Sequence, residues 1–220
     1  MNQRTIRVKG SAEVSAVPDL VVITFDLASK NYDYGKCLEN LSFKTESLRE
    51  ELASIGLERD SLKTARFNID TDFRWDRQRD RHIFQGYEAY HVMRVEFPFE
   101  KDYLNKVLHV LSRAESEASF RISFQVKDPE PLKQQAIAGA VKNSREKALV
   151  LAEAAVVSLG DIIQIDYSWS EVRFETDFEV CEAKATMSEP SYDITPEDVD
   201  VSDSVTVIWE INKQINIAGI

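Results

Sequence analysis

The sequence predicts an α+β fold in which antiparallel or mixed sheets pack against one long and two shorter helices. Several segments alternate apolar and polar residues with a period of two, which is typical of strands that bury one face. Three other segments repeat apolar residues at helical spacing. These helices are interspersed among strands that are mostly apolar on one face, which argues against a doubly wound fold. With 220 residues, 43% of them hydrophobic, the chain is long enough for a single domain over residues 1–220.

The chain begins with two predicted strands, over residues 5–17 and 20–29. Pro18-Asp19 separates them, and this pair is typical of turns, so we expect the two strands to form a hairpin. Every second residue of the later strand is apolar, which predicts one core-facing side. The expected core residues there are Val21, Ile23, Phe25 and Leu27.

A helix is predicted next, because apolar residues recur three, four or seven positions apart between Tyr34 and Ile55. Gly56 follows as its expected C-terminal cap. Cys37 lies on the apolar stripe, and we expect it to be a small buried hydrophobe and not a reactive thiol. Strands over residues 62–73 and 86–97 follow, the second ending at Pro98 because proline cannot donate to a ladder.

The second half of the chain begins with a short helix around residues 103–111 and a strand over 120–126. The longest helix is expected to begin at Asp128-Pro129 and to end near Gly160. Its expected apolar side consists of Ile137, Val141, Ala148, Leu151 and Ala155, and Gly139 permits close contact with a neighbour. Two strands, over 163–169 and 199–211, complete the chain.

Two surface features stand out. Residues 72–82 interleave four arginines and three aspartates with aromatic residues, a pattern typical of an exposed β-arm, which we place at about residues 70–86. Single-stranded nucleic acid is the less favoured partner, because the net charge is only +1. Subunit contact is favoured instead, through Phe73, Trp75 and Phe84, since exposed aromatic residues and arginines are enriched at interfaces.

Net charge is concentrated near the C-terminus. Of the total charge of −11, −9 lies between residues 171 and 203, where eleven acidic residues face two basic ones. Because periodicity is weak there, we expect a long acidic surface loop at about residues 175–198. The alternative function is a binding adaptor that engages a basic protein partner through residues 175–203, with Glu197, Asp198 and Asp200 as candidate contacts.

No motif predicts an enzyme. The sequence contains no nucleophile elbow, no phosphate-cradling glycine loop and no dinucleotide fingerprint, so we expect no catalytic residues and no cofactor. No metal site is expected either, because the three histidines and two cysteines lack ligand spacing and the acidic stretch fails the calcium-loop pattern. His91 falls on an apolar strand face and is interpreted as a hydrogen-bonded core histidine. No run is long enough to span a membrane, and without a signal peptide a cytoplasmic location is expected, or a periplasmic or secreted one if a leader was removed.

Several short segments, in fixed order, resemble the SIMPL domain family. Each of them is weak alone, but together they cover almost the whole chain. The matching segments are 6–14 with Pro18-Asp19-Leu20, 55–57, the Gly-Tyr-x-Ala strand at 86–90, 122–124, the helix signature at 140–148 with 151–152, Leu159-Gly160, and the closing valine-rich strand.

The resemblance implies a SIMPL-like fold and a protein without an established catalytic residue set. Bacterial members include secreted or periplasmic immunogenic proteins, some linked to tolerance of oxidative stress, and at least one forms a ring-like or channel-like oligomer. The founding animal member is a signalling adaptor. We therefore expect a non-enzymatic, self-associating protein, a homo-oligomer with a scaffold or structural-assembly role.

Overall fold

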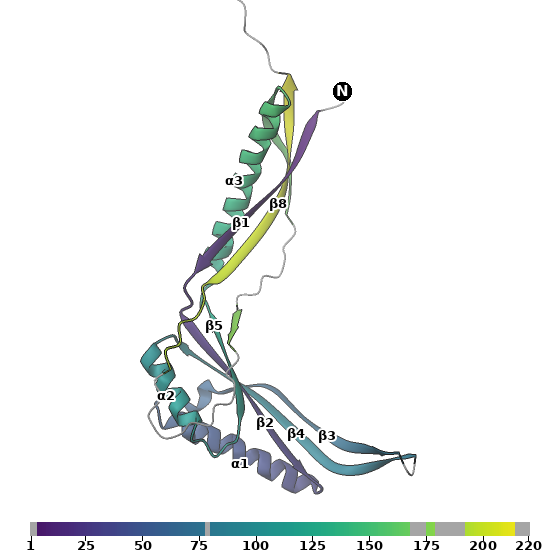
Figure 1. The fold of residues 1–220 in the computed structure, drawn as a ribbon, viewed down its shortest axis with the longest axis vertical. Helices are drawn as coiled ribbons and strands as arrows, with labels where there is room; N and C mark the ends of the chain where they lie inside the picture. The colour runs from purple at the N-terminus through teal and green to yellow at the C-terminus, as the bar shows by residue number, and fades with distance from the viewer. Residues whose placement is uncertain (1–3, 78–79, 168–174, 179–191, 214–220) are drawn as a thin grey trace, which may run out of the picture. The chain divides into compact units, whose positions relative to one another are not determined.

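The computed structural model describes residues 4–77, 80–167, 175–178 and 192–213 (Figure 1). Its fold is α+β with antiparallel sheets, as the sequence predicts. The elements are β1 (Thr5–Ala16), β2 (Leu20–Asn31), α1 (Tyr34–Ala53), the 3-10 helix η1 (Arg59–Ser61), β3 (Lys63–Asp76), β4 (Arg81–Pro98), α2 (Lys101–Leu111), β5 (Ser119–Gln125), α3 (Glu130–Ala154), β6 (Val157–Asp166), β7 (Glu175–Phe178) and β8 (Val199–Lys213).

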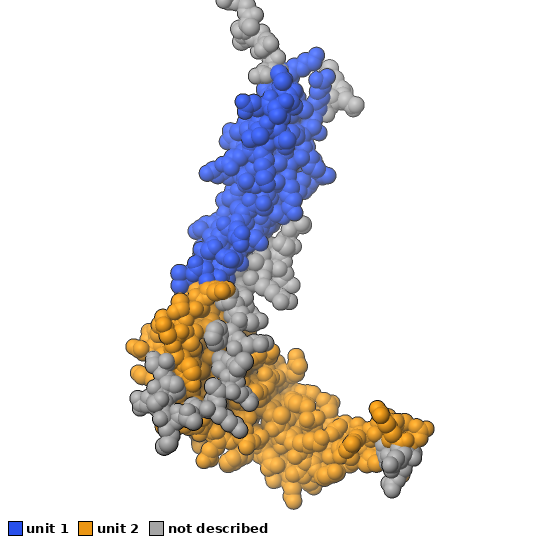
Figure 2. Space-filling model, in the orientation of Figure 1, with its two compact units in different colours: residues 1–17, 126–175, 198–220 blue, residues 18–125, 176–197 orange. Residues whose placement is uncertain are grey.

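The chain divides into two compact units, coloured separately in Figure 2. Unit 1 combines residues 1–17, 126–175 and 198–220, and unit 2 combines residues 18–125 and 176–197. Each unit has its own sheet and its own apolar cluster, and each is described by itself below. The single domain over residues 1–220 stays a prediction.

Unit 2 contains a five-stranded sheet with strand order β3-β4-β2-β5-β7, packed against α1 and α2. The core-facing residues predicted for β2 are confirmed, since Val21, Ile23 and Phe25 are fully buried and Leu27 is 1% exposed. Alternation works here because β2 is a central strand, paired with β4 on one side and β5 on the other.

The helix α1 has local signals at both ends. Asp33 caps its N-terminus, its side chain accepting a hydrogen bond from the Lys36 amide at 2.9 Å. Gly56 follows the helix with a φ of +93°, a conformation that glycine adopts without steric cost. Cys37 is fully buried and its thiol donates to the Ser29 carbonyl, so the prediction of a structural cysteine is confirmed.

Unit 1 contains a three-stranded sheet with strand order β1-β8-β6, and α3 packs on it. The predicted hairpin of the first two strands is therefore wrong. All twelve residues of β1 pair with β8, whereas β2 belongs to the sheet of unit 2, so Pro18-Asp19 joins strands of different sheets. A turn-forming pair predicts a change of direction, but it does not specify which strand the chain will pair with.

The predicted end of the long helix is also wrong, and its predicted apolar face is right only at Ala148, which is fully buried, and in part at Val141, which packs against the core of unit 1. The helix ends at Ala154, where Val156 adopts a positive φ of 54°, and Gly160 lies within β6. Leu151 and Ala155 are exposed. The buried stripe consists of small residues four apart, namely Ala136, Ala140, Ser144, Ala148 and Ala152.

Small residues are required because β1 approaches the backbone of α3 directly. A Cβ atom at Gly10 would lie 2.0 Å from the Ala140 carbonyl oxygen, and one at Gly139 would lie 2.7 Å from the Ala12 Cβ. The expected role of Gly139 in close packing is thus confirmed. Larger side chains on the buried stripe would push the helix off the sheet.

Candidate functional site

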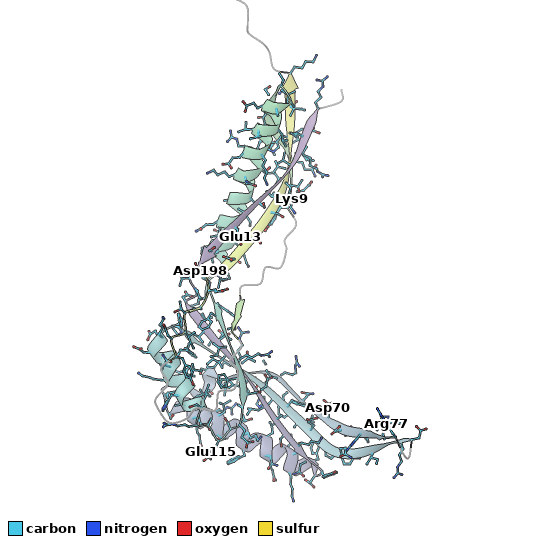
Figure 3. The ribbon with its side chains drawn as sticks, in the orientation of Figure 1. Lys9, Glu13, Asp70, Arg77, Glu115 and Asp198 are labelled. Carbon is cyan, nitrogen blue, oxygen red and sulfur yellow. The ribbon has the colours of Figure 1, made fainter. Side chains whose placement is uncertain are left out.

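The candidate site is the two-stranded end of the β3–β4 hairpin in unit 2, which we call the arm and define as residues 72–86. β4 is long, but β2 pairs only with its part from Tyr87 to Pro98. From Gly86 to Arg81, β4 pairs with β3 alone. Arg77 lies at the far end of this hairpin and Asp70 lies on β3 before the arm begins (Figure 3).

A β-bulge at the base of the arm determines which side chains share a face. The register between β3 and β4 shifts between Asp72 and Phe73, opposite Gly86 and Phe84. Because a bulge adds one residue to one strand, it brings Phe84 to the same face as Tyr87, although the two are three positions apart. Strict alternation would have placed them on opposite faces.

Only glycine fits at position 86 of this bulge. Its φ is +121°, and a Cβ atom there would lie 2.7 Å from the carbonyl oxygen of Asn31 at the end of β2. On the opposite face, Lys30 and Asp72 form an ion pair that links β2 to the arm. The hydrogen bond to Asp72 raises the pKa of Lys30.

The three aromatic residues predicted as an interface lie together on one face of the arm. Phe73 pairs with Phe84 across the two strands, with ring centroids 5.8 Å apart. Trp75 pairs with His82 in the same way, at 4.8 Å. The exposed fractions of Phe73, Trp75 and Phe84 are 52%, 47% and 37%.

The aromatic surface continues beyond these three residues. The ring centroid of Phe84 lies 6.3 Å from that of Tyr32 and 5.3 Å from that of Tyr87. The ring centroid of Tyr87 lies in turn 5.3 Å from that of Tyr34, the first residue of α1. We call the whole set the aromatic row, which consists of Tyr32, Tyr34, Phe73, Trp75, His82, Phe84 and Tyr87. Sequence reasoning missed four of the seven, because their proximity depends on the bulge and on where α1 begins.

The aromatic row is the continuation of the core face of the sheet past the end of its helical cover. Tyr87 alternates along β4 with the fully buried Ala89, which faces the core. α1 begins only at Tyr34, so it does not extend over the arm (Figure 1). Contiguous exposed aromatic surface of this kind is typical of protein–protein contact sites.

His91 is positioned as a structural residue. It is 8% exposed, and both of its ring nitrogens are hydrogen-bonded. Nδ1 lies 3.1 Å from the hydroxyl oxygen of Thr45 on α1, and Nε2 lies 2.8 Å from that of Thr64 on β3. Because the Thr45 hydroxyl donates to the Leu41 carbonyl, its oxygen accepts from Nδ1, and Nε2 then accepts from Thr64. The neutral ring thus satisfies both partners. The interpretation of His91 as a hydrogen-bonded core histidine is confirmed.

Stability is expected to fall on acidification because of His91. Burial, and secondarily the charge of Arg49, lower its pKa below the usual 6.5. The unfolded chain therefore binds a proton at this residue more readily than the folded chain does. The contribution of neutral His91 to the free energy of unfolding is fully present above about pH 6.5 and is lost as the pH falls through the folded pKa. Urea titrations between pH 7.5 and 5 would show a flatter pH dependence in His91→Gln than in the wild type. Equal slopes in the wild type and His91→Gln would contradict the assignment.

The predicted partner-binding acids do not all lie in a loop. Glu197 and Asp198 are exposed in an irregular segment, and Figure 3 labels Asp198. Asp200 lies within β8, as do all residues from 199 to 203, where its carboxylate accepts a hydrogen bond from Ser15 at 2.6 Å. Residues 199–203 of the predicted adaptor segment are thus strand. The loop predicted at about residues 175–198 is also wrong at its start, because residues 175–178 form β7 of the five-stranded sheet. Residues 179–191, which carry Cys181 and several acids, lie outside the described residues.

The start of this irregular segment is attached to unit 2. Lys101, the first residue of α2, contacts the Asp193 carboxylate at 3.1 Å and the Thr195 hydroxyl at 3.0 Å. Ile194, between them, is 9% exposed and belongs to the core of unit 2.

Within the described ranges, no three histidine, cysteine or acidic side chains cluster as metal ligands would. Among those same residues, no helix combines the length and apolarity needed to cross a bilayer.

Comparison with known proteins finds one family match. The model of the SIMPL family, described as a protein of unknown function (DUF541), matches residues 6–209. The uncharacterized protein YggE of Edwardsiella ictaluri (strain 93-146) is 24% identical over 207 residues, which cover 93% of this chain and 85% of that protein. A solved structure of a hydrolase from Listeria innocua aligns over 92% of both chains at 10% identity, with a TM-score of 0.16. Similarity that weak carries no inference about fold or activity.

Proposed function

The chain belongs to the SIMPL family, and we propose that it is a non-enzymatic protein that self-associates through the aromatic row of its arm and acts as a scaffold or structural assembly. One observation carries the proposal: the seven rings of the aromatic row are contiguous along the arm and the adjoining ends of β2 and α1, and Phe73, Trp75 and Phe84 on the arm are 37–52% exposed. In a monomer this apolar surface stays in contact with water, which is unfavourable. Its burial against a second copy would lower the free energy.

The chemistry of the arm suits a contact between proteins. Aromatic side chains lose little conformational entropy when they are buried, and tryptophan and arginine are the residues most enriched among those that dominate binding energy. Arg74 and Arg77 accompany Trp75 on β3 and at its end. The adaptor function, through residues 175–203, stays a separate prediction.

Removal of the aromatic rings is expected to weaken self-association without unfolding the protein. Trp75→Ala combined with Phe84→Ala deletes two central members of the aromatic row. We expect the dissociation constant to rise at least about 30-fold, because a single buried aromatic anchor commonly contributes about 2 kcal/mol or more. Light scattering at several protein concentrations would measure the change in mass.

A matched control is available in the same chain. Phe43→Ala combined with Val150→Ala removes two apolar side chains, each 66% exposed, that lie outside the arm. This control should keep the wild-type mass. A wild-type protein that stays monomeric at every concentration, or an arm variant with unchanged mass, would overturn the proposed function.

A further inference from the structure

Unit 1 carries a second exposed apolar surface, along β6. α3 packs mainly on β1 and β8, because Gly10 lets β1 reach its backbone. One flank of α3 faces β1, where Asn143 accepts from the Ser11 amide and Lys147 donates to the Lys9 carbonyl. In the order β1-β8-β6, the third strand therefore lies beyond the main cover of the helix.

The ladder shows that the uncovered side chains of β6 belong to the helix-facing side of the sheet. Ile162 pairs with Trp209 and Ile165 pairs with Val207, and both partners on β8 are buried. Directly opposed residues in a ladder point to the same face. Yet Ile162 and Ile165 are 43% and 49% exposed.

We call this surface the β6 strip, which consists of Ile162, Ile163, Ile165 and Tyr167. All four side chains are 41–49% exposed. The Tyr167 hydroxyl donates to Asp203 at 2.8 Å, which holds the ring against the sheet. Register shifts on both sides of Ile162 interrupt the regular ladder of β6, so side-chain contact suits this surface better than addition of another strand.

The charges around the two apolar surfaces are complementary. The arm, residues 72–86, contains four arginines and three aspartates, a net charge of +1. Residues 157–166 contain Asp161 and Asp166 and no basic residue, but Arg7 of β1 pairs with Asp166 at 3.0 Å, so the net charge around the strip is −1. Pairing of arm with arm, or of strip with strip, would bring like charges together, whereas pairing of arm with strip brings opposite charges together.

We propose that the arm of one copy docks its aromatic row on the β6 strip of a second copy. This inference rests on the proposed function and specifies its geometry. In one arm-to-strip contact the first copy uses its arm and the second its strip, so one free strip and one free arm remain. Two copies either exchange both contacts about a two-fold axis or bind further copies through the free surfaces in a heterologous contact. Such an interface builds rings when the rotation between copies closes and open chains when it does not.

A complementation experiment tests the docking. The arm variant is Trp75→Ala with Phe84→Ala, and the strip variant is Ile162→Ser with Ile165→Ser. Each variant alone is expected to be monomeric at concentrations where the wild type is oligomeric. Mixed in equal amounts, they should form a dimer and nothing larger, because only one intact arm and one intact strip can meet. Native mass spectrometry of the mixture, with one variant isotopically labelled, would measure this.

The possible outcomes separate the two proposals. If the arm variant is monomeric and the strip variant keeps the wild-type mass, the arm self-associates elsewhere, so the proposed function stands and the docking on β6 is wrong. If both variants are monomeric but their mixture does not dimerise, the docking is likewise wrong. If both keep the wild-type mass, both proposals fail. Circular dichroism would establish that each variant is folded.

Salt dependence gives a second test that needs no substitution. Opposite charges should make association of the wild type at least a few-fold weaker at 0.5 M than at 0.05 M salt, as screening increases. Association that strengthens with salt would instead indicate contact between like-charged surfaces and would overturn the docking.

Discussion

Gly10→Ala is expected to unfold the sheet and helix of unit 1. The new Cβ atom would lie 2.0 Å from the Ala140 carbonyl oxygen and 2.6 Å from the Ser144 amide nitrogen. Both atoms belong to the backbone of α3, so no change of rotamer relieves the clash. Either the helix separates from β1, which exposes the apolar cluster around Val8 and Val207, or the strand bends. We expect a loss of about 3 kcal/mol or more in the free energy of unfolding.

Hydrogen exchange of the β1 and β8 amides, together with urea denaturation, would measure this loss. Gly35→Ala is the matched control, because a Cβ atom at Gly35 would meet only the Asp33 side chain, at 3.2 Å. The control should stay within about 1 kcal/mol of the wild type. If Gly10→Ala is as stable as Gly35→Ala, the close packing of β1 on α3 is incorrect.

Phe25→Ala is expected to have a comparable effect on unit 2. The Phe25 side chain is fully buried at the centre of β2 and contacts Phe120 on β5 with ring centroids 6.2 Å apart. Its truncation removes a large apolar group and leaves a cavity that the flanking strands β4 and β5 cannot easily close. We expect a loss of about 3–5 kcal/mol in the free energy of unfolding, measured by urea denaturation.

The same substitution at an exposed phenylalanine provides the comparison. Phe43 on α1 is 66% exposed, so Phe43→Ala should change the free energy of unfolding by less than about 0.5 kcal/mol. Similar losses at Phe25 and Phe43 would mean that the burial pattern of β2 does not describe the protein in solution.

Most individual elements could be predicted because their signals are local. The alternation of β2 and the capped stripe of α1 each lie within about twenty residues, and both appear where the pattern places them. The structural role of Cys37 was predictable for the same reason, since its burial follows from its position on the stripe.

The candidate site was predictable only in part. Phe73, Trp75 and Phe84 stand out in the sequence because they lie among charged residues between two strand patterns. Tyr32, Tyr34 and Tyr87 do not stand out, because residues 20–34 and 87 read as ordinary strand and helix starts. They join the aromatic row because the bulge at Gly86 rotates Phe84 toward them.

The sequence by itself determined the fold class, the position of most helices and strands, and the arm with its three exposed aromatic residues. Only the tertiary structure decided that β1 pairs with β8, that small residues form the buried face of α3, and that the isoleucines of β6 remain exposed. The reason is physical. Side-chain periodicity reports which face of an element is apolar, whereas strand partners and helix cover depend on close approaches, such as that of Gly10 to Ala140, between residues far apart in the chain.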